Sequence, residues 1–405
     1  MSDDRWLLPE GIEDIVAPRA RRMESLRRQV LDLLDAWGYD LVQPPLIEFL
    51  DSLLTGTGHG LDLYTFKLTD QLSGRLLGVR ADITPQTARI DASRLRRDGP
   101  VRLCYVGTVL KTRADAAGGS RSPVQIGAEL FGHGGLESDL EIVSLLLETL
   151  GLARIDSPLL DIGHVGIYRA LARLANLAEP DERELFDILQ RKAVPDLAAF
   201  LDGRDIRPAV REALAALVEL HGDPADVIAL ARQRLAVGGD EVTRALAALD
   251  ALCARLTEAY PGVGQHLDLA ELRGYRYHTG MVYAAFVPGH GREVARGGRY
   301  DDVGAAFGRA RPATGFSADL GELVRLGAGE PDRAGHAVLA PADDDSELHR
   351  AVRALRREGR RVVRVLPGMT EAPAALGCRE VLVREGERWV VRAARAAPDP
   401  SAESD

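Results

Sequence analysis

Polar side chains occur at even spacing in two otherwise apolar segments of the chain. The segment GVRADITPQ places Arg80, Asp82 and Thr84 two residues apart, and VQIGAEL places Gln125 four residues before Glu129. Successive side chains of an extended strand point to opposite faces, so residues at even spacing share a face. If both segments are strands, each presents its polar groups on one side of a sheet.

Two later segments add a guanidinium and aromatic groups. The segment LRGYRYHTG contains Arg273, Tyr277 and His278. On a regular strand Arg273 and Tyr277 share one face, and His278 lies on the opposite one. The segment GGRYDD places Tyr300 after a pair of glycines, which allow a ligand to approach the backbone closely.

Each of these segments also has an ordinary explanation. Carboxylates and amides are often solvated, arginines often form surface ion pairs, and tyrosine rings often belong to the core. A lone histidine is more often structural than a ligand or a base. Together, however, the groups match a small zwitterion, because carboxylates suit an ammonium group and arginine suits a carboxylate. We predict that its binding site is formed by Asp82, Thr84, Gln125, Glu129, Arg273, Tyr277, His278 and Tyr300.

The pattern of apolar residues indicates the elements that position these groups. Residues 18–37 have helical periodicity, and β-rich arms around Ser73 and Gly74 predict a hairpin. A further helix is expected to begin near Pro85. Another is expected over residues 138–150, with Ser138 as its N-cap.

The secondary structure that the sequence pattern predicts changes twice along the chain. Residues of about 167–258 have a helical pattern rich in alanine and leucine, and β character returns after them. We therefore predict an α+β core over 1–330, in which a helical insertion interrupts an antiparallel sheet flanked by helices. A small α/β domain is expected over 335–395. Residues 396–405 are expected to form a disordered tail.

Composition narrows the class of protein. Acidic residues outnumber basic ones by 61 to 51, giving a net charge of −10, which argues against a general nucleic-acid binder. A run of arginines over 350–364 is read as a solvated helix face rather than an RNA site. The three cysteines form no CxxC pair, so neither a zinc site nor a disulfide framework is predicted. Without a signal-peptide pattern or a long apolar run, the expected compartment is the cytoplasm and no membrane contact is expected.

From about residue 6 to residue 325 the sequence resembles histidyl-tRNA synthetase, a class II synthetase built on an antiparallel sheet. RADITP resembles that family's histidine-binding strand, and QIGAELFG resembles the strand whose Gln and Glu hold histidine. LRGYRYHTGMVY and GGRYDD are similar to two further signatures of the family. The resemblance implies that the eight residues of the predicted site bind histidine.

The sequence departs from that family where the synthetase binds ATP. Lys111 and Arg113 stand where the family has an Arg-x-Glu pair, and Lys111 cannot supply the planar fork of an arginine. In GFSADLGEL, Glu322 stands where an arginine would meet the triphosphate. A carboxylate at this position is expected to repel ATP. The C-terminal domain is also shorter than an anticodon-binding domain.

This combination resembles the regulatory subunits of ATP phosphoribosyltransferase, a family related to the synthetase. The resemblance implies a protein with no catalytic residues, no metal and no other cofactor. It also implies a hetero-octamer with the short-form catalytic subunit, feedback control of the first step of histidine biosynthesis by L-histidine, and no tRNA partner. A divergent histidyl-tRNA synthetase is the main alternative, and a ligase of the same fold acting on another acceptor is a third. Both would need the arginines that are replaced.

Overall fold

The computed structural model describes the chain over residues 6–56, 59–115, 119–272, 274, 277–327, 337–369 and 372–394. The chain divides into two compact units, Met1–Ala328 and Gly329–Asp405. Each unit has apolar clusters of its own. No helix within these described ranges is both long and apolar enough to cross a membrane.

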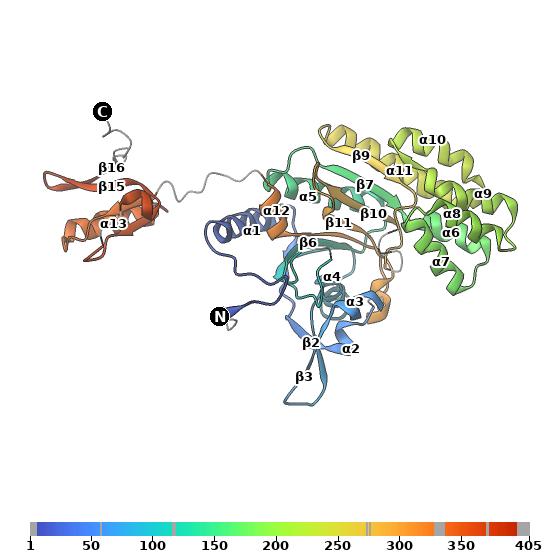
Figure 1. Cartoon of the computed structure of the whole chain (residues 1–405), viewed down its shortest axis with the longest axis horizontal. Coiled ribbons are helices and arrows are strands. Elements are labelled where there is room, and N and C mark those ends of the chain that lie inside the picture. Colours follow the sequence, from blue (N-terminus) through green and yellow to red (C-terminus); the bar gives the residue numbers. More distant parts are fainter. Residues whose placement is uncertain are drawn as a thin grey trace. The chain divides into compact units, whose positions relative to one another are not determined.

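The larger unit is built on a sheet that contains nine strands among the described residues (Figure 1). Their order is β1-β5-β6-β12-β11-β10-β7-β9-β8. Neighbouring strands from β5 to β7 in this order pair antiparallel. At the two ends of this run, β1 pairs in parallel with β5 and β9 pairs in parallel with β7. This sheet confirms the predicted α+β class. The bounds are β1 (Asp40–Leu41), β5 (Val101–Thr108), β6 (Val124–Phe131), β7 (Leu159–His164), β8 (His221–Gly222), β9 (Gly264–Asp268), β10 (Met281–Phe286), β11 (Glu293–Arg299) and β12 (Ala313–Asp319).

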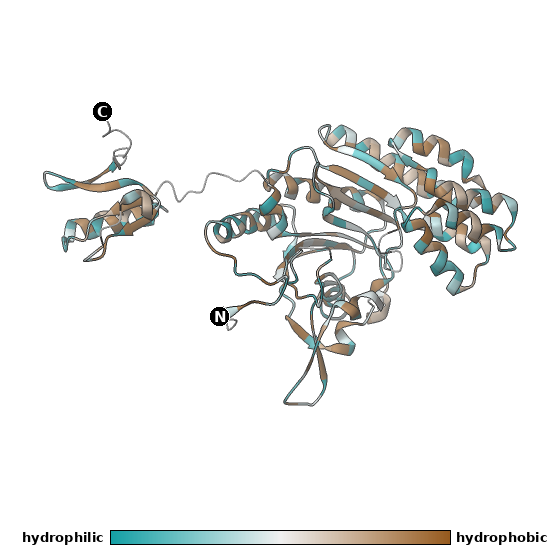
Figure 2. Ribbon diagram, in the orientation of Figure 1, coloured by the Kyte–Doolittle hydropathy of each residue, from teal (hydrophilic) through white to brown (hydrophobic). Residues whose placement is uncertain are grey.

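Three helices support the part of the sheet that carries β6 and β12. They are α1 (Arg19–Ala36), α5 (Leu136–Leu152) and α12 (Leu320–Leu326). Helix α5 packs on β12 and against α1, and α1 also packs against α12. In Figure 2 hydrophobic and hydrophilic residues alternate along the strands of this sheet, while the visible side of α1 is largely hydrophilic. The buried side chains of α1 lie three or four residues apart, as one face of a helix requires: Met23, Leu26, Val30 and Leu34.

A set of helices follows β7 and packs at the β7-β9-β8 end of the sheet (Figure 1). This set occupies the stretch that the sequence predicts to be a helical insertion. Its 3₁₀ turns are η3 (Leu217–Glu219) and η4 (Ala236–Gly238). Its helices are α6 (Val165–Ala175), α7 (Glu179–Gln190), α8 (Val194–Asp202), α9 (Pro208–Ala216), α10 (Pro224–Arg234) and α11 (Gly239–Ala259).

A second, three-stranded sheet has the order β2-β4-β3, with β2 (Ile47–Phe49), β3 (Phe66–Thr69) and β4 (Leu76–Val79). Strands β3 and β4 form the predicted hairpin, and Gly74 has a φ of 72° in its turn. The short helices α2 (Leu50–Leu53) and α3 (His59–Tyr64) lie between β2 and β3 in the chain.

Two local predictions from the sequence are wrong. Arg80, Asp82 and Thr84 do not share a strand face, because strand β4 ends at Val79 and helix α4 (Thr84–Arg89) begins at Thr84. This helix continues into the π-helix η2 (Ile90–Leu95). Pro85 lies in the first turn of α4, where its fixed φ and missing N–H favour a helix. Helix α5 begins before Ser138, whose hydroxyl donates to Gly135 O instead of capping the helix.

The smaller unit has a four-stranded sheet in the order β14-β13-β15-β16. Strand β13 pairs in parallel with β14 and β15, and β15 and β16 form an antiparallel hairpin. Leu348 and Val352 of α13 are buried in the same cluster as the sheet residue Val338. The bounds are β13 (Ala337–Ala340), α13 (Ser346–Arg357), β14 (Val362–Arg364), η7 (Pro373–Leu376), β15 (Cys378–Glu385) and β16 (Arg388–Ala393).

Candidate ligand-binding site

Glu129 is a buried carboxyl group at the centre of the candidate site. It lies on β6, only 1% exposed, and pairs across the sheet with Gly315 of β12. Its Oε1 accepts a hydrogen bond from the Tyr105 hydroxyl at 3.0 Å, and its Oε2 accepts one from the Tyr300 hydroxyl. A Cβ atom at Gly315 would overlap Oε2, so a glycine is needed beside this carboxyl group.

Asp82, Thr84 and Gln125 extend the same network. The hydroxyls of Thr84 and Tyr105 are 2.9 Å apart. Asp82 Oδ1 accepts from the Thr84 N–H at 3.1 Å and from Gln125 Nε2 at 2.8 Å, and Gln125 Oε1 accepts from the Ile83 N–H at 2.9 Å. Although Asp82 and Thr84 are not on a strand, the turn into α4 brings them to the predicted partners.

Tyr277 and His278 lie in a turn before β10 rather than on a strand, so the prediction that they face opposite sides of a strand is wrong. Their N–H groups both donate to Gly274 O, at 2.7 and 2.8 Å, and Gly274 has a φ of 67°. The Tyr277 ring lies 5.0 Å from the Tyr300 ring, centroid to centroid, and 5.4 Å from the His278 ring. The Tyr277 hydroxyl is buried without a hydrogen-bond partner among the residues that the structure describes. Arg273 lies outside those residues, and its contact with a ligand stays a prediction.

Burial controls the protonation of this site. Desolvation raises the pKa of Glu129 to about 8, although the hydroxyl groups of Tyr300, Thr84 and Tyr105 oppose the shift. Burial and the nearby Glu129 raise the pKa of Tyr105 and of Tyr300 well above the ordinary value. The tyrosines are therefore neutral donors, and a cation placed beside Glu129 would favour its ionised form.

Tyr105 is a member of this network that the sequence prediction missed. It is fully buried on β5, and a Cβ atom at its cross-strand partner Gly127 would overlap its hydroxyl. The sequence VRLCYVGT alone gives no signal for this role, because a tyrosine in an apolar strand is typical of a core residue.

The groups that replace the synthetase's ATP-binding residues have other partners. Lys111 forms an ion pair with Asp115 at 2.5 Å, and the Arg113 guanidinium lies 4.9 Å from the centre of the Tyr64 ring. Glu322 pairs with three side chains, and those of Arg325 and Arg292 hold its pKa down to about 2. Glu322 is therefore an ionised carboxylate with cationic neighbours, and its expected repulsion of ATP stays a prediction. The distances from its Oε1 are 2.6 Å to Arg325 Nη2, 2.9 Å to Arg292 Nη2 and 2.9 Å to His290 Nε2.

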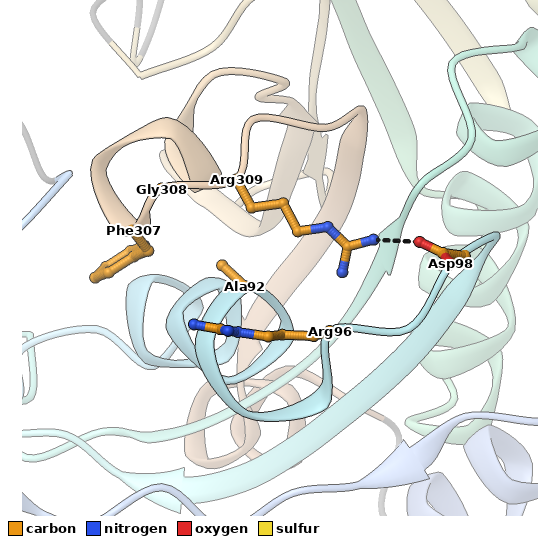
Figure 3. Close-up of a pocket in the computed structure, with 6 residues that line it drawn as sticks. All are labelled: Ala92, Arg96, Asp98, Phe307, Gly308 and Arg309. Carbon is orange, nitrogen blue, oxygen red and sulfur yellow. Dashed lines mark hydrogen bonds and ion pairs between the residues drawn. The ribbon is translucent and has the colours of Figure 1, made fainter.

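A cavity of about 390 Å³ lies away from these residues, between η2 and the 3₁₀ helix η5 (Val303–Phe307). In Figure 3, Arg309 reaches toward Asp98, with which it forms an ion pair at 3.1 Å, and Arg96 extends beneath Ala92. None of the eight predicted residues lines this cavity. It is therefore not the predicted site. Among the described residues no cluster of three or more His, Cys, Asp or Glu could hold a metal ion.

Comparison with known proteins adds two family matches. The model of the histidyl-tRNA synthetase family matches residues 11–323, and that of the ATP phosphoribosyltransferase subunit HisZ C-terminal domain matches residues 334–392. The chain is 58% identical to an ATP phosphoribosyltransferase regulatory subunit of Thioalkalivibrio sulfidiphilus, covering 96% of this chain and 98% of that protein. It is 55% identical to the subunit of the same name from Alkalilimnicola ehrlichii, with the same coverage.

Two solved structures are similar in fold. An ATP phosphoribosyltransferase regulatory subunit/histidyl-tRNA synthetase from Bacillus halodurans C aligns with a TM-score of 0.79 at 26% identity, over 92% of this chain and 96% of that one. A histidyl-tRNA synthetase from Nostoc sp. PCC 7120 aligns with a TM-score of 0.77 at 18% identity, over 93% of this chain and 91% of that one. The latter shows likeness of fold alone.

Proposed function

Because the chain belongs to the family of ATP phosphoribosyltransferase regulatory subunits, we propose that it binds histidine at the Glu129 site and transmits feedback inhibition to a short-form catalytic subunit. It has no catalytic activity of its own in this proposal, and the partner supplies the reaction. The complex is the hetero-octamer that the family resemblance implies.

The observation that carries the histidine assignment is the buried Glu129 carboxyl group, held by Tyr105 and Tyr300. Burying a carboxylate costs free energy unless a cation or hydrogen-bond donors compensate for the lost hydration. Glu129 has two tyrosine donors, but no cation pairs with it among the described residues. Histidine offers an ammonium group and an imidazole N–H, both of which can donate to Glu129 or Asp82.

The remaining predicted residues fit other parts of the same ligand. The Tyr277 hydroxyl lacks a partner in the described part of the chain and can bond an imidazole nitrogen. His278 lies against Tyr277, with its ring edge-on to the tyrosine ring, and is assigned a supporting contact beside the imidazole. Arg273 is assigned to the ligand carboxylate, a contact that an arginine makes with two parallel hydrogen bonds.

Titration calorimetry with L-histidine tests the proposal on wild type and Glu129→Gln. The substitution keeps the volume and removes the charge that a bound cation requires. Affinity is expected to fall about thirty-fold or more, since truncating one side of a buried charged contact costs about 2–5 kcal/mol. Inhibition curves of the reconstituted complex are expected to shift to higher histidine concentration by a similar factor.

Glu148→Gln is the matched control. Glu148 also accepts hydrogen bonds from two aromatic side chains, Trp37 at 3.2 Å and Tyr260 at 3.4 Å, but none of the predicted residues is among these partners. Its substitution is expected to leave histidine affinity unchanged. Equal histidine inhibition in wild type and Glu129→Gln would place the effector site elsewhere.

A further inference from the structure

Tyr105 lies at the junction of the hydrogen-bond network and has no role assigned by the predicted site. Its hydroxyl is 2.9 Å from the Thr84 hydroxyl and 3.0 Å from Glu129 Oε1, and the residue is fully buried. We propose that Tyr105 is a positioning residue of the proposed histidine site, on which this inference rests. Its hydroxyl fixes the Glu129 carboxyl group in the orientation that receives the cationic nitrogen of the ligand.

The direction of the hydrogen bonds follows from the groups involved. A tyrosine hydroxyl has one proton, and an ionised carboxylate can only accept. When Glu129 is ionised, Tyr105 therefore donates to Oε1, and Thr84 donates to Tyr105. Tyr300 donates to Oε2, so both carboxylate oxygens are held from opposite sides.

Close packing restricts the orientation of the Glu129 carboxyl group. Gly315 on β12 contacts Oε2 so closely that a methyl group there would overlap it. Gly127 on β6 leaves the space that the Tyr105 hydroxyl occupies. The two glycines thus let a tyrosine and a carboxyl group fill one buried volume. Without the Tyr105 hydroxyl, Oε1 loses the bond that fixes the carboxyl group about its last torsion.

Tyr105 also affects the charge of Glu129. The groups that face this carboxyl come from several elements: Tyr105 from β5, Thr84 from α4, Tyr300 after β11, Tyr283 from β10, Tyr277 from the turn before β10, and Asp82 before α4. Burial and Asp82 raise the pKa of Glu129, and the hydrogen bond from Tyr105 lowers it. Removing that bond is therefore expected to make Glu129 harder to ionise.

Calorimetric titration of histidine into Tyr105→Phe, over a pH range that spans the titration of Glu129 near pH 8, tests the proposal. Tyr283→Phe is the matched control, because Tyr283 is equally buried and donates to Gly315 O at 2.8 Å rather than to Glu129. Below pH 8 the affinity of Tyr105→Phe is expected to be about ten-fold or more below wild type, as for a lost hydrogen bond to a charged group.

The loss is expected to shrink as the pH rises above the titration of Glu129, since both proteins then have an ionised carboxylate. Ionisation of histidine itself is common to all the proteins and cancels in the comparison. A purely structural defect would instead give a loss that does not change with pH. Melting curves establish that each variant is folded. If Tyr105→Phe does not fold, the same titration is done on Thr84→Val, which removes the donor to Tyr105 and leaves the ring in place. Because Thr84 is itself a predicted ligand residue, only the change of its loss with pH, and not the size of the loss, counts for or against the network.

Each outcome decides between the possibilities. Wild type that binds histidine, with a pH-dependent loss in Tyr105→Phe and none in Tyr283→Phe, supports the proposal. Wild type that binds histidine, with no loss or a pH-independent loss in Tyr105→Phe, overturns the role of Tyr105 and leaves the histidine site intact. Wild type that does not bind histidine overturns both.

Discussion

The Glu129 carboxyl group has a measurable consequence for stability. In the unfolded chain it loses its proton near the ordinary pKa of 4.5, whereas the folded, ligand-free protein keeps the proton until about pH 8. Between these values the unfolded state binds fewer protons, so the free energy of unfolding falls as the pH rises, by about 1.4 kcal/mol per pH unit from this group. Above about pH 8 the contribution is constant.

Glu129→Gln is therefore expected to remove this slope. Denaturant unfolding of the ligand-free protein across pH 5 to 8 should show a steeper loss of stability in wild type than in the variant, and the two curves should run parallel above about pH 8. Parallel curves over the whole range would contradict the raised pKa of Glu129.

At the same scale, sequence reasoning identified residue types better than their geometry. Gln125 and Glu129 lie on one strand as their spacing predicts. Asp82 and Thr84 reach the network because a turn and the helix start at Thr84 redirect the chain, which strand alternation cannot anticipate. Tyr105 was missed because a buried tyrosine in an apolar strand cannot be told from a core residue until its hydroxyl partners are known.

At the scale of elements, the helix at Pro85 and the hairpin at Gly74 were predictable because proline and glycine constrain the backbone locally. Partners across the sheet were not predictable, since they depend on register. Glu322 on α12 illustrates this limit: its cations Arg292 and Arg325 come from the loop before β11 and from its own helix.

The two elements that would hold ATP in a synthetase give the next prediction. Lys111 follows β5 and is paired with Asp115, and the arginines near α12 are already paired with Glu322. The purified chain is expected to show no histidine-dependent exchange between ATP and pyrophosphate above background. An active histidyl-tRNA synthetase assayed in parallel is the positive control. A clear exchange rate would instead support the synthetase alternative.

At the scale of the whole molecule, the sequence indicated a regulator because residues that resemble a histidine-binding site occur together with altered residues at the ATP-binding positions. Arginines of the smaller unit are also used within that unit: Arg350 pairs with Glu347, Arg360 pairs with Glu380, and Arg356 donates to Val362 O. These contacts favour the interpretation of the arginine run as a solvated face with partners inside the unit, rather than as an RNA site. The surface that meets the catalytic subunit could not be predicted, because exposed apolar residues such as Leu63 and Leu72 have no partner-specific pattern.

The proposed role requires a stable complex, because a protein without a reaction of its own can regulate only by binding an enzyme. Mixing the chain with a short-form ATP phosphoribosyltransferase is expected to give one large species by size-exclusion chromatography with light scattering, with both chains present. A long-form enzyme is the control, since an enzyme that does not depend on this subunit is expected to elute separately. Histidine can inhibit such a complex only if it binds one of its states more tightly than another, so saturating histidine should change the activity of the complex and leave the isolated catalytic chain unaffected. Two separate peaks at micromolar concentrations of both chains would contradict the proposed partnership.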